Sequence, residues 1–295
     1  MKNGGIMISQ CFPKSRNHDG ETLKVGQYVF EEAGYTQIQM VDILDDSERA
    51  AFGEVALRNN ARITYCIARL LNDHKLYLCD LDDEKRKAAI ELVKSQFAKA
   101  REVGAEAITL ISGPRPESEE ARKAALAVLT EAMIEVAAYG RQVAPEITLR
   151  IEPLDVSAHK KNTLGSTQEA IALCEAAERA GERVRLCFDT AHAILNGEDM
   201  EESIAAAGKW IEEFHLCNAC VTPGHALYGD RHIAPGEPGA FDIPQYQKFI
   251  AAAKVHCPDA RVFTEYMCPD GMSGEEMVAL HAQIVSESNV MVRRK

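Results

Sequence analysis

Short apolar runs rich in β-branched residues alternate with longer amphipathic stretches along nearly the whole chain, and this alternation constrains the fold more than any other feature. The runs predict eight strands: Ile6–Gln10, Thr36–Asp42, Arg62–Ile67, Ala107–Gly113, Thr148–Glu152, Val184–Asp189, Glu213–Cys217 and Arg261–Tyr266. Runs such as AITLIS and RLCFD are almost continuously apolar. Such runs indicate strands that are buried on both faces of a parallel sheet.

The segments between these runs predict helices. Glu84–Val103 and Glu119–Val143 are rich in Ala, Glu, Lys and Leu, with apolar residues three and four apart. Ser166 and Glu169 have the spacing of a capping box. Three helices are expected to end at a glycine that a strand soon follows, as αβ turns favour: Gly34, Gly104 and Gly181. The repeat predicts an α/β fold, a single (β/α)8 barrel domain over residues 1–295, with a doubly wound open sheet as the alternative.

Charge and cysteine content narrow the class of protein. The formal net charge of −12 disfavours binding to nucleic acid or to anionic membranes, because both need a basic surface. We expect no transmembrane helix, because no run reaches about 18 apolar residues, and the N-terminus does not resemble a signal peptide. The nine cysteines are odd in number and lie mostly in apolar runs, which fits a reduced cytoplasmic protein with buried thiols.

Each of the last four predicted strands supplies one metal-type ligand at its trailing end: Glu152, Asp189, His215 and Glu265. In such barrels the active site lies at the carboxyl ends of the strands. Three carboxylates and an imidazole that converge there would be desolvated and would repel one another without a cation. A single carboxylate at a strand end is more often a helix cap, but four in succession predict a shared divalent metal site.

Further polar residues follow these strands. His192 comes three residues after Asp189, and residues 218–243, rich in Gly and Pro, are expected to form an active-site loop rather than a regular element. Within that loop, Asp230 and His232 could bind a second ion, or Arg231 and His232 could hold substrate oxygens. The alternative is a loop stabilised by its own Asp–Arg contacts.

Other candidates carry weaker signals. Three residues after the Glu152 strand could grip an anionic or hydroxylated substrate: His159, Lys160 and Lys161. Arg115, after the fourth strand, could reach the same pocket. Cys217 and Cys220 form a CxxC without a second pair at zinc-ribbon spacing, which favours structural thiols.

The chain resembles the xylose-isomerase-like TIM barrel superfamily, the group of sugar-phosphate isomerases and epimerases that also contains endonuclease IV-type DNA repair enzymes. The resemblance rests on IEP at 151–153, FDTAH at 188–192, FHLCN at 214–218, GDRH at 229–232 and TEY at 264–266. Each motif is short, and their order and barrel positions carry the assignment.

The resemblance implies roles for individual residues. In ketose 3-epimerases of this superfamily a Glu–Asp–His–Glu set, which matches the four strand-end residues, binds Mn2+ or a similar ion. The two glutamates, here Glu152 and Glu265, also pass the proton. The histidine of the Asp-x-x-His motif, here His192, contacts the substrate, as does an arginine for which Arg231 is the candidate.

The expected activity is therefore a metal-dependent isomerase or epimerase of a sugar or sugar derivative. An ion on the carbonyl and a neighbouring hydroxyl would acidify the C–H between them and stabilise the enediolate, while one glutamate removes the proton and the other returns it. Oxygen-rich ligation with one imidazole favours Mn2+, with Mg2+, Co2+ or Zn2+ as alternatives.

Other functions remain open. A lyase or dehydratase acting on a keto-sugar or inosose would use the same chemistry, and lyases of this superfamily that cleave 3-keto-C-glycosides work with a partner subunit. Endonuclease IV enzymes bind three zinc ions. Asp230 and His232 match their Asp-x-His element, but the early strands supply no histidine. A sugar-binding barrel without activity is a fourth hypothesis. A homo-oligomer is a further expectation by analogy with the superfamily.

Overall fold

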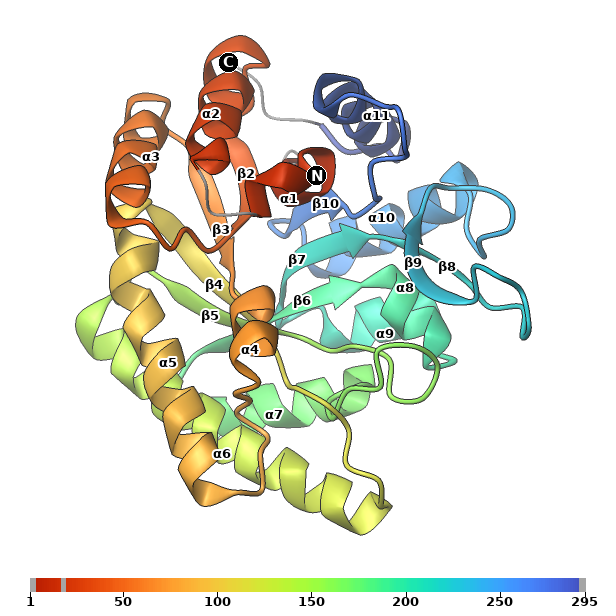
Figure 1. The fold of residues 1–295 in the computed structure, drawn as a ribbon. Coiled ribbons are helices and arrows are strands. Elements are labelled where there is room, and N and C mark those ends of the chain that lie inside the picture. The colour runs from red at the N-terminus through yellow and green to blue at the C-terminus, as the bar shows by residue number, and fades with distance from the viewer. Residues whose placement is uncertain (1–3, 17–19, 292–295) are drawn as a thin grey trace.

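The computed structural model describes residues 4–16 and 20–291, and within them eight parallel strands form one sheet. In spatial order they are β1 (Ile6–Met7), β2 (Gln37–Val41), β3 (Arg62–Cys66), β4 (Ala105–Ile111), β5 (Thr148–Glu152), β6 (Val184–Asp189), β7 (Ile211–Leu216) and β10 (Arg261–Thr264). A parallel bridge between Gly4 and Val262 joins the first strand to the last, so the sheet curls into a barrel (Figure 1). The predicted (β/α)8 barrel is confirmed, and the open sheet is wrong.

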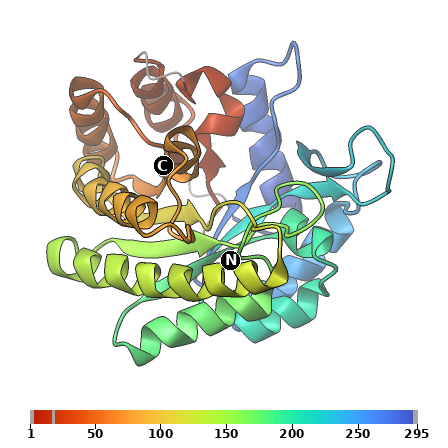
Figure 2. The same ribbon diagram turned by 60° about the horizontal axis from the view of Figure 1, so that its bottom comes forward.

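Helices follow the strands and cover the outside of the barrel (Figures 1 and 2). They are α1 (Ile8–Cys11), α2 (Glu21–Gln27), α3 (Asp46–Arg58), α4 (Ala68–His74), α5 (Asp83–Glu102), α6 (Glu119–Val143), α7 (Thr167–Arg179), α8 (Thr190–Leu195), α9 (Met200–Ala207), α10 (Ile243–His256) and α11 (Gly274–Glu287), with a 3-10 turn over Pro13–Arg16 and a π-helical turn over Tyr28–Glu32. The predicted capping box opens α7, with Ser166 accepting from the Glu169 amide. The three predicted glycines have φ of 75° at Gly34, 73° at Gly104 and 79° at Gly181, a conformation that favours glycine.

Some bounds differ from those expected. The first strand ends at Met7 rather than at Gln10, because residues 8–11 turn into α1. The fourth and seventh strands, predicted as 107–113 and 213–217, begin and end earlier, and the last strand ends at Thr264. Glu265 therefore stands just beyond its strand, where side chains turn over the barrel mouth.

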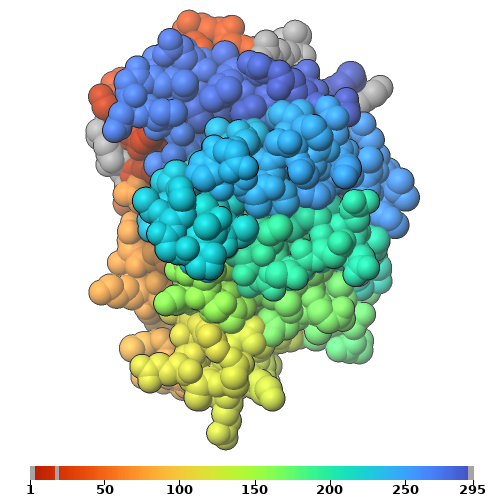
Figure 3. Space-filling model, turned by 90° about the vertical axis from the view of Figure 1, so that its right-hand side faces the viewer, coloured from red at the N-terminus to blue at the C-terminus, as the bar shows by residue number. Residues whose placement is uncertain are grey.

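The segment expected to be an irregular loop contains a hairpin, so that expectation is wrong. β8 (Asn218–Cys220) pairs in antiparallel fashion with β9 (Gly229–Ile233), with a register shift between Asn218 and Ala219. Glycine and proline occur mainly outside the paired residues. The composition of the whole segment therefore predicts a loop even though part of it forms strands. The hairpin lies at the end of the barrel toward which β6 and β7 point (Figure 1), and on the surface it sits beside the green central and blue C-terminal parts of the chain (Figure 3).

Among the described residues, none of the helices is both long enough and apolar enough to cross a membrane.

Candidate active site

The four predicted metal ligands come together at the carboxyl end of the barrel. Glu152 and Asp189 are the last residues of β5 and β6, His215 is the penultimate residue of β7, and Glu265 follows β10. One ligand atom from each lies within 4.8 Å of the others. The His215 Nδ1 atom is 3.1 Å from Glu152 Oε1, 3.1 Å from Glu265 Oε2 and 3.9 Å from Asp189 Oδ2. Parallel strands that end together give this convergence.

The two carboxylate oxygens of Asp189 have different surroundings. Its Oδ1 atom caps α8 by accepting from the amides of Ala191 (2.7 Å) and His192 (3.0 Å). Its Oδ2 atom is buried and has no hydrogen-bond partner among the described residues. A buried carboxylate oxygen without a donor is costly unless a cation occupies the space before it. The helix-cap interpretation and the ligand interpretation of Asp189 are therefore compatible.

The carboxylate of Glu265 is held by a chain of side chains from the start of the protein. Gln10 on α1 donates from Nε2 to Glu265 Oε1 at 3.0 Å. Arg16 in turn donates from Nη2 to Gln10 Oε1 at 2.8 Å. These contacts orient the Gln10 amide so that its NH2 group faces the carboxylate. The turn of residues 8–11 into a helix makes this contact available.

An ionic layer lies beneath His215 inside the barrel. The His215 Nε2 atom is 3.4 Å from Glu213 Oε1, while Glu213 Oε2 accepts from Arg150 Nη1 (2.8 Å) and from the Thr64 hydroxyl (2.7 Å). Although burial opposes its ionisation, Arg150 and His215 lower the pKa of Glu213 to about 2. Glu213 thus presents a carboxylate to one nitrogen of His215, so that Nδ1 points to the other three ligands. Carboxylates play this orienting part behind many metal-bound histidines.

The pKa shifts of two carboxyl groups in the cluster have opposite directions. Burial, together with the carboxylates of Glu265 and Glu152, raises the pKa of Asp189 to about 8 against the opposing effect of His192. Burial also opposes ionisation of Glu265, yet His232 and His215 hold its pKa well below the usual range. Three carboxylates, one imidazole and an oxygen without a donor are a donor set that fits a divalent ion.

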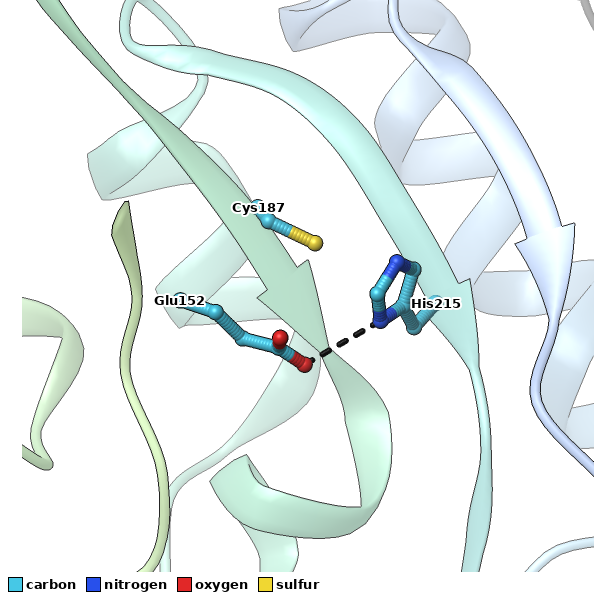
Figure 4. A group of neighbouring side chains, drawn as sticks. All are labelled: Glu152, Cys187 and His215. Carbon is cyan, nitrogen blue, oxygen red and sulfur yellow. Dashed lines mark hydrogen bonds and ion pairs between the residues drawn. The ribbon is translucent and has the colours of Figure 1, made fainter. Parts of the chain in front are cut away.

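A thiol adjoins the cluster. Cys187 is on β6 two residues before Asp189, so both side chains point into the barrel. Figure 4 shows Glu152, Cys187 and His215 directed toward one another from three strands, and their ligand atoms also lie within 4.8 Å of one another. Burial is the main reason that the pKa of the Cys187 thiol is raised well above its ordinary value.

The cluster opens into a cavity of about 520 Å³, large enough for a small carbohydrate. Glu152, His215 and Glu265 line it, together with the predicted residues His192, Asp230, His232 and Lys160. Arg16 and Arg69 also line it. The cavity therefore offers both acidic and basic groups to a polar ligand.

His192 is buried and held from two sides. Its Nδ1 atom lies 3.3 Å from Asp155 Oδ2 and 3.3 Å from the Asp155 amide nitrogen, and its Nε2 atom lies 3.6 Å from Asp230 Oδ2. Burial opposes protonation, but Asp189 and Asp155 raise the pKa of His192 to about 9. The ring is therefore fixed in orientation at the wall of the cavity.

Other candidates do not reach the cavity. Arg231 is exposed, because Asp230 and His232 on either side of it in β9 turn inward and strand side chains alternate. Arg115 pairs with Glu119. His159 packs beneath Gly229, and Lys161 is exposed. Asp230 pairs with Lys160 rather than with Arg231, so the self-contained Asp–Arg loop is not observed.

Sequence reasoning missed four residues of the site: Gln10, Arg16, Asp155 and Glu213. A signal existed only for Glu213, which lies two residues before His215 and so shares its face of the strand. The sequence pattern predicts a strand at Gln10, and the contact of Gln10 with Glu265 spans 255 positions of sequence. Such a contact leaves no local pattern.

Comparison with known proteins identifies the family of this chain. A family model described as a xylose isomerase-like TIM barrel matches residues 29–276. No curated protein sequence matches the chain significantly.

Solved structures share the fold. The 3-keto-D-glucoside 4-epimerase from E. coli, in its apo form, has a TM-score of 0.71 at 10% identity and covers 98% of this chain and 99% of its own. The IOLI protein with a zinc atom has a TM-score of 0.70 at 18% identity and covers 98% of each chain. D-psicose 3-epimerase in the presence of D-fructose has a TM-score of 0.66 at 16% identity and covers 97% of this chain and 95% of its own. At these identities the likeness concerns the fold.

Proposed function

This chain belongs to the xylose isomerase-like TIM barrel family, and on that premise we propose that it is a metal-dependent isomerase or epimerase of a sugar or sugar derivative. The observation that carries the proposal is the convergence of Glu152, Asp189, His215 and Glu265 within 4.8 Å at the edge of the cavity. Two of the structures with this fold are sugar epimerases and one holds zinc, which supports the same class of reaction.

We assign the four residues as ligands of one divalent ion, with Mn2+ as the first candidate and Mg2+, Co2+ and Zn2+ as alternatives. The ion would supply positive charge for the substrate oxygens that become negative when a neighbouring C–H proton leaves. The proposal draws support from Asp189 Oδ2, which is buried without a donor.

The proton is moved by Glu152 and Glu265. One carboxylate takes the proton from carbon and leaves the electron pair in an enediolate, and the other gives a proton back to the opposite face or to the adjacent carbon. The two carboxylates approach the His215 ring from β5 and from the end of β10, each with an oxygen 3.1 Å from Nδ1. Two carboxylates from different strands suit removal at one face and return at another.

His192, His232, Lys160 and Arg16 are the substrate-binding side chains in this proposal, because all four line the cavity. Arg231, which the resemblance implied as a substrate contact, is exposed and is not among them. The strands β3 and β4 end in Cys66 and Ile111, so the histidines of a three-zinc DNA repair site are missing there. A small carbohydrate is therefore the proposed substrate.

The test is deuterium wash-in. Metal-loaded protein is incubated in D2O with ketoses, inososes and 3-keto-glycosides, and mass spectrometry follows label and product mass. We expect label beside the carbonyl with the substrate mass otherwise retained, and loss of exchange after chelation. Loss of a substituent would assign a lyase instead. Equal exchange with and without the ion, or cleavage of an abasic DNA duplex, would contradict the proposal.

A further inference from the structure

We propose that Glu152, Cys187 and His215 form an alternative metal site, which takes a thiophilic divalent ion such as Zn2+ or Cd2+ through a carboxylate, a thiolate and an imidazole. The site shares Glu152 and His215 with the four-residue cluster, so the two sites cannot be filled together. That exclusion rests on the proposed metal role of the cluster. Binding of a thiophilic ion does not depend on the reaction that the cavity performs.

Strand register places Cys187 deeper in the barrel than the last ligand of its own strand. Across β6 and β7, Asp189 is paired with His215, whereas Cys187 is paired with Glu213, two residues closer to the amino end of the barrel. Side chains two residues apart on a strand share a face, so Cys187 and Asp189 both point into the barrel, at two depths. The imidazole of His215 thus has a carboxylate at its own level and a thiol one level below.

Three ligand atoms lie close enough to hold one ion. The Sγ atom of Cys187, a ring nitrogen of His215 and a carboxylate oxygen of Glu152 are all within 4.8 Å of one another. Glu152 Oε1 is 3.1 Å from His215 Nδ1, and Figure 4 shows the three side chains directed toward the space between them. Three points at this spacing share a centre no more than about 2.8 Å from each, against zinc bonds of about 2.3 Å to sulfur and about 2.0 Å to nitrogen or oxygen. Small side-chain rotations therefore bring all three to bonding distance.

A purely structural role fits Cys187 less well than it fits other buried thiols of the barrel. Four cysteines pack within the main apolar core: Cys11, Cys79, Cys174 and Cys257. Cys187 is fully buried, but it belongs to neither apolar cluster of the described residues. The ionisable side chains that act on its thiol are His215, Glu152 and Glu213. A thiol that only fills space behaves as a small apolar group and needs no such neighbours.

The imidazole shared by the two sites lacks a partner on one side. His215 Nε2 is buried and has no hydrogen-bond partner in the part of the chain that the structure describes. A carboxylate oxygen of Glu213, Oε1, lies 3.4 Å away and is equally without a hydrogen bond. Buried polar atoms without partners are costly. A cation among the thiol, the ring and Glu152 would offset part of this cost.

The softness of the ligands decides which ion takes which set. Thiolates favour Zn2+ and other soft ions, whereas carboxylates favour Mn2+ and Mg2+. A thiophilic ion displaces the thiol proton of Cys187 to the solvent and binds the sulfur in its place. It also draws Glu152 and His215 away from Asp189 and Glu265. The expected consequence is that a thiophilic ion excludes the harder ion and prevents Glu152 from exchanging a proton with the substrate.

Cadmium provides a test that needs no turnover. The full chain, reduced and freed of metal, is titrated with Cd2+ while the ultraviolet charge-transfer band of a cadmium thiolate is recorded. The titration is repeated on the chain loaded with Mn2+, and electron paramagnetic resonance measures the Mn2+ that is released. We expect the band in both titrations, and we expect the amount of Mn2+ released to equal the amount of Cd2+ bound.

Two cysteine variants identify the thiolate. Cys187→Ser should lose the band, whereas Cys217→Ser, which removes another fully buried thiol near the cluster, should keep it. Because even changes outside the ligand set cost about 10–100-fold in metal affinity, loss of a direct ligand should raise the Cd2+ concentration that releases half of the Mn2+ by at least about tenfold. Circular dichroism checks that each variant folds, and Cys187→Ala replaces the serine variant if that variant does not.

Three results would overturn the proposal. One is a metal-free wild type that gives no band with Cd2+. Another is a band that survives in Cys187→Ser and disappears in Cys217→Ser, because the thiolate would then lie beside His232. The third is a Cd2+ ion that gives the band while Mn2+ stays bound, because the two ions would then not share ligands. A wild type that gives the band but never binds Mn2+ would support the thiolate site and contradict the proposed metal role of the cluster.

Discussion

Glu152 and Glu265 differ from the other two proposed ligands because, in the proposed mechanism, each also exchanges a proton with carbon. Replacing either by Gln keeps an oxygen for the ion but removes the base. We expect Glu265→Gln and Glu152→Gln to lower kcat by at least about 100-fold, with weaker metal binding and an unchanged fold. Steady-state kinetics and metal titration measure this, with the exposed Glu275→Gln as control. Full activity in Glu265→Gln would refute the mechanism.

Glu213 offers a separate residue-scale prediction, because it touches His215 but not the cavity. Glu213→Gln would leave Arg150 with a weaker partner in the barrel interior and His215 with a poorly oriented ring. We expect about 3 kcal/mol less stability and roughly 10–100-fold weaker metal binding. Chemical unfolding and metal competition measure the two effects.

Glu212 provides the matched control. It also pairs with Arg150, at 3.2 Å, but makes no contact with His215. Glu212→Gln should therefore reduce stability while sparing metal affinity. Equal loss of affinity in both variants would show that Glu213 does not act through the imidazole.

At the scale of elements, helix α11 is fixed to β10 by a neutral histidine. His281 is fully buried, contacts the Thr264 hydroxyl through Nδ1 and donates from Nε2 to the Tyr266 carbonyl oxygen at 3.2 Å. Burial lowers the pKa of His281 to about 4, with the backbone contacts and Glu265 opposing the effect.

The sign of the pH effect follows from this pKa. On acidification the unfolded chain, in which the histidine pKa is near 6.5, takes up the proton before the folded chain does. The contribution of neutral His281 to the free energy of unfolding is therefore complete above about pH 6.5 and falls between about pH 6.5 and pH 4. Between pH 7 and pH 5 we expect the free energy of unfolding of the wild type to fall by roughly 2 kcal/mol through this histidine. The His281→Gln variant should not show this fall. Urea unfolding at both pH values tests this, and His74→Gln, on the surface, should behave like the wild type.

Helices and strands were predictable from the sequence where neighbouring residues determine them. Val184–Asp189, Glu119–Val143 and the α7 capping box follow from apolar runs, periodicity and a short side-chain contact, and all three are confirmed. The β8–β9 hairpin was missed, because its strands have three and five residues and are stabilised by packing on the barrel mouth. The convergence of the four strand-end residues was predictable because barrel topology fixes where strands end. The Gln10–Glu265 contact was not predictable, because it depends on closure of the sheet.

At the scale of the whole molecule, an ion that binds the folded barrel must stabilise it. The proposed ligands lie at the ends of four strands, so the unfolded chain offers no comparable site. At a free concentration about 100-fold above Kd, each bound ion should raise the free energy of unfolding by about 2.7 kcal/mol. We expect chelation to lower the unfolding midpoint and metal to restore it.

Asp189→Asn should abolish most of that metal-dependent gain, because it removes the charge on the oxygen that lacks a donor. Asp270→Asn, an exposed substitution, should leave it unchanged. Thermal unfolding with and without the ion compares the two variants. If the unfolding midpoint of the wild type does not change when metal is added or removed, the four side chains do not hold an ion.

The closure of the barrel has a mechanical consequence for the chemistry. β1 has only two residues, and the seam between it and β10 is held by contacts such as the one from the Gly5 amide to the Val262 carbonyl oxygen, at 3.0 Å. A side chain at position 5 would collide with Phe263, whose ring atom lies 2.5 Å from the place of a Cβ. Glu265 stands on one side of this seam and Gln10 on the other. Loosening the seam would therefore displace Glu265, one of the two proposed proton carriers, while Glu152, within the continuous sheet, stayed in place.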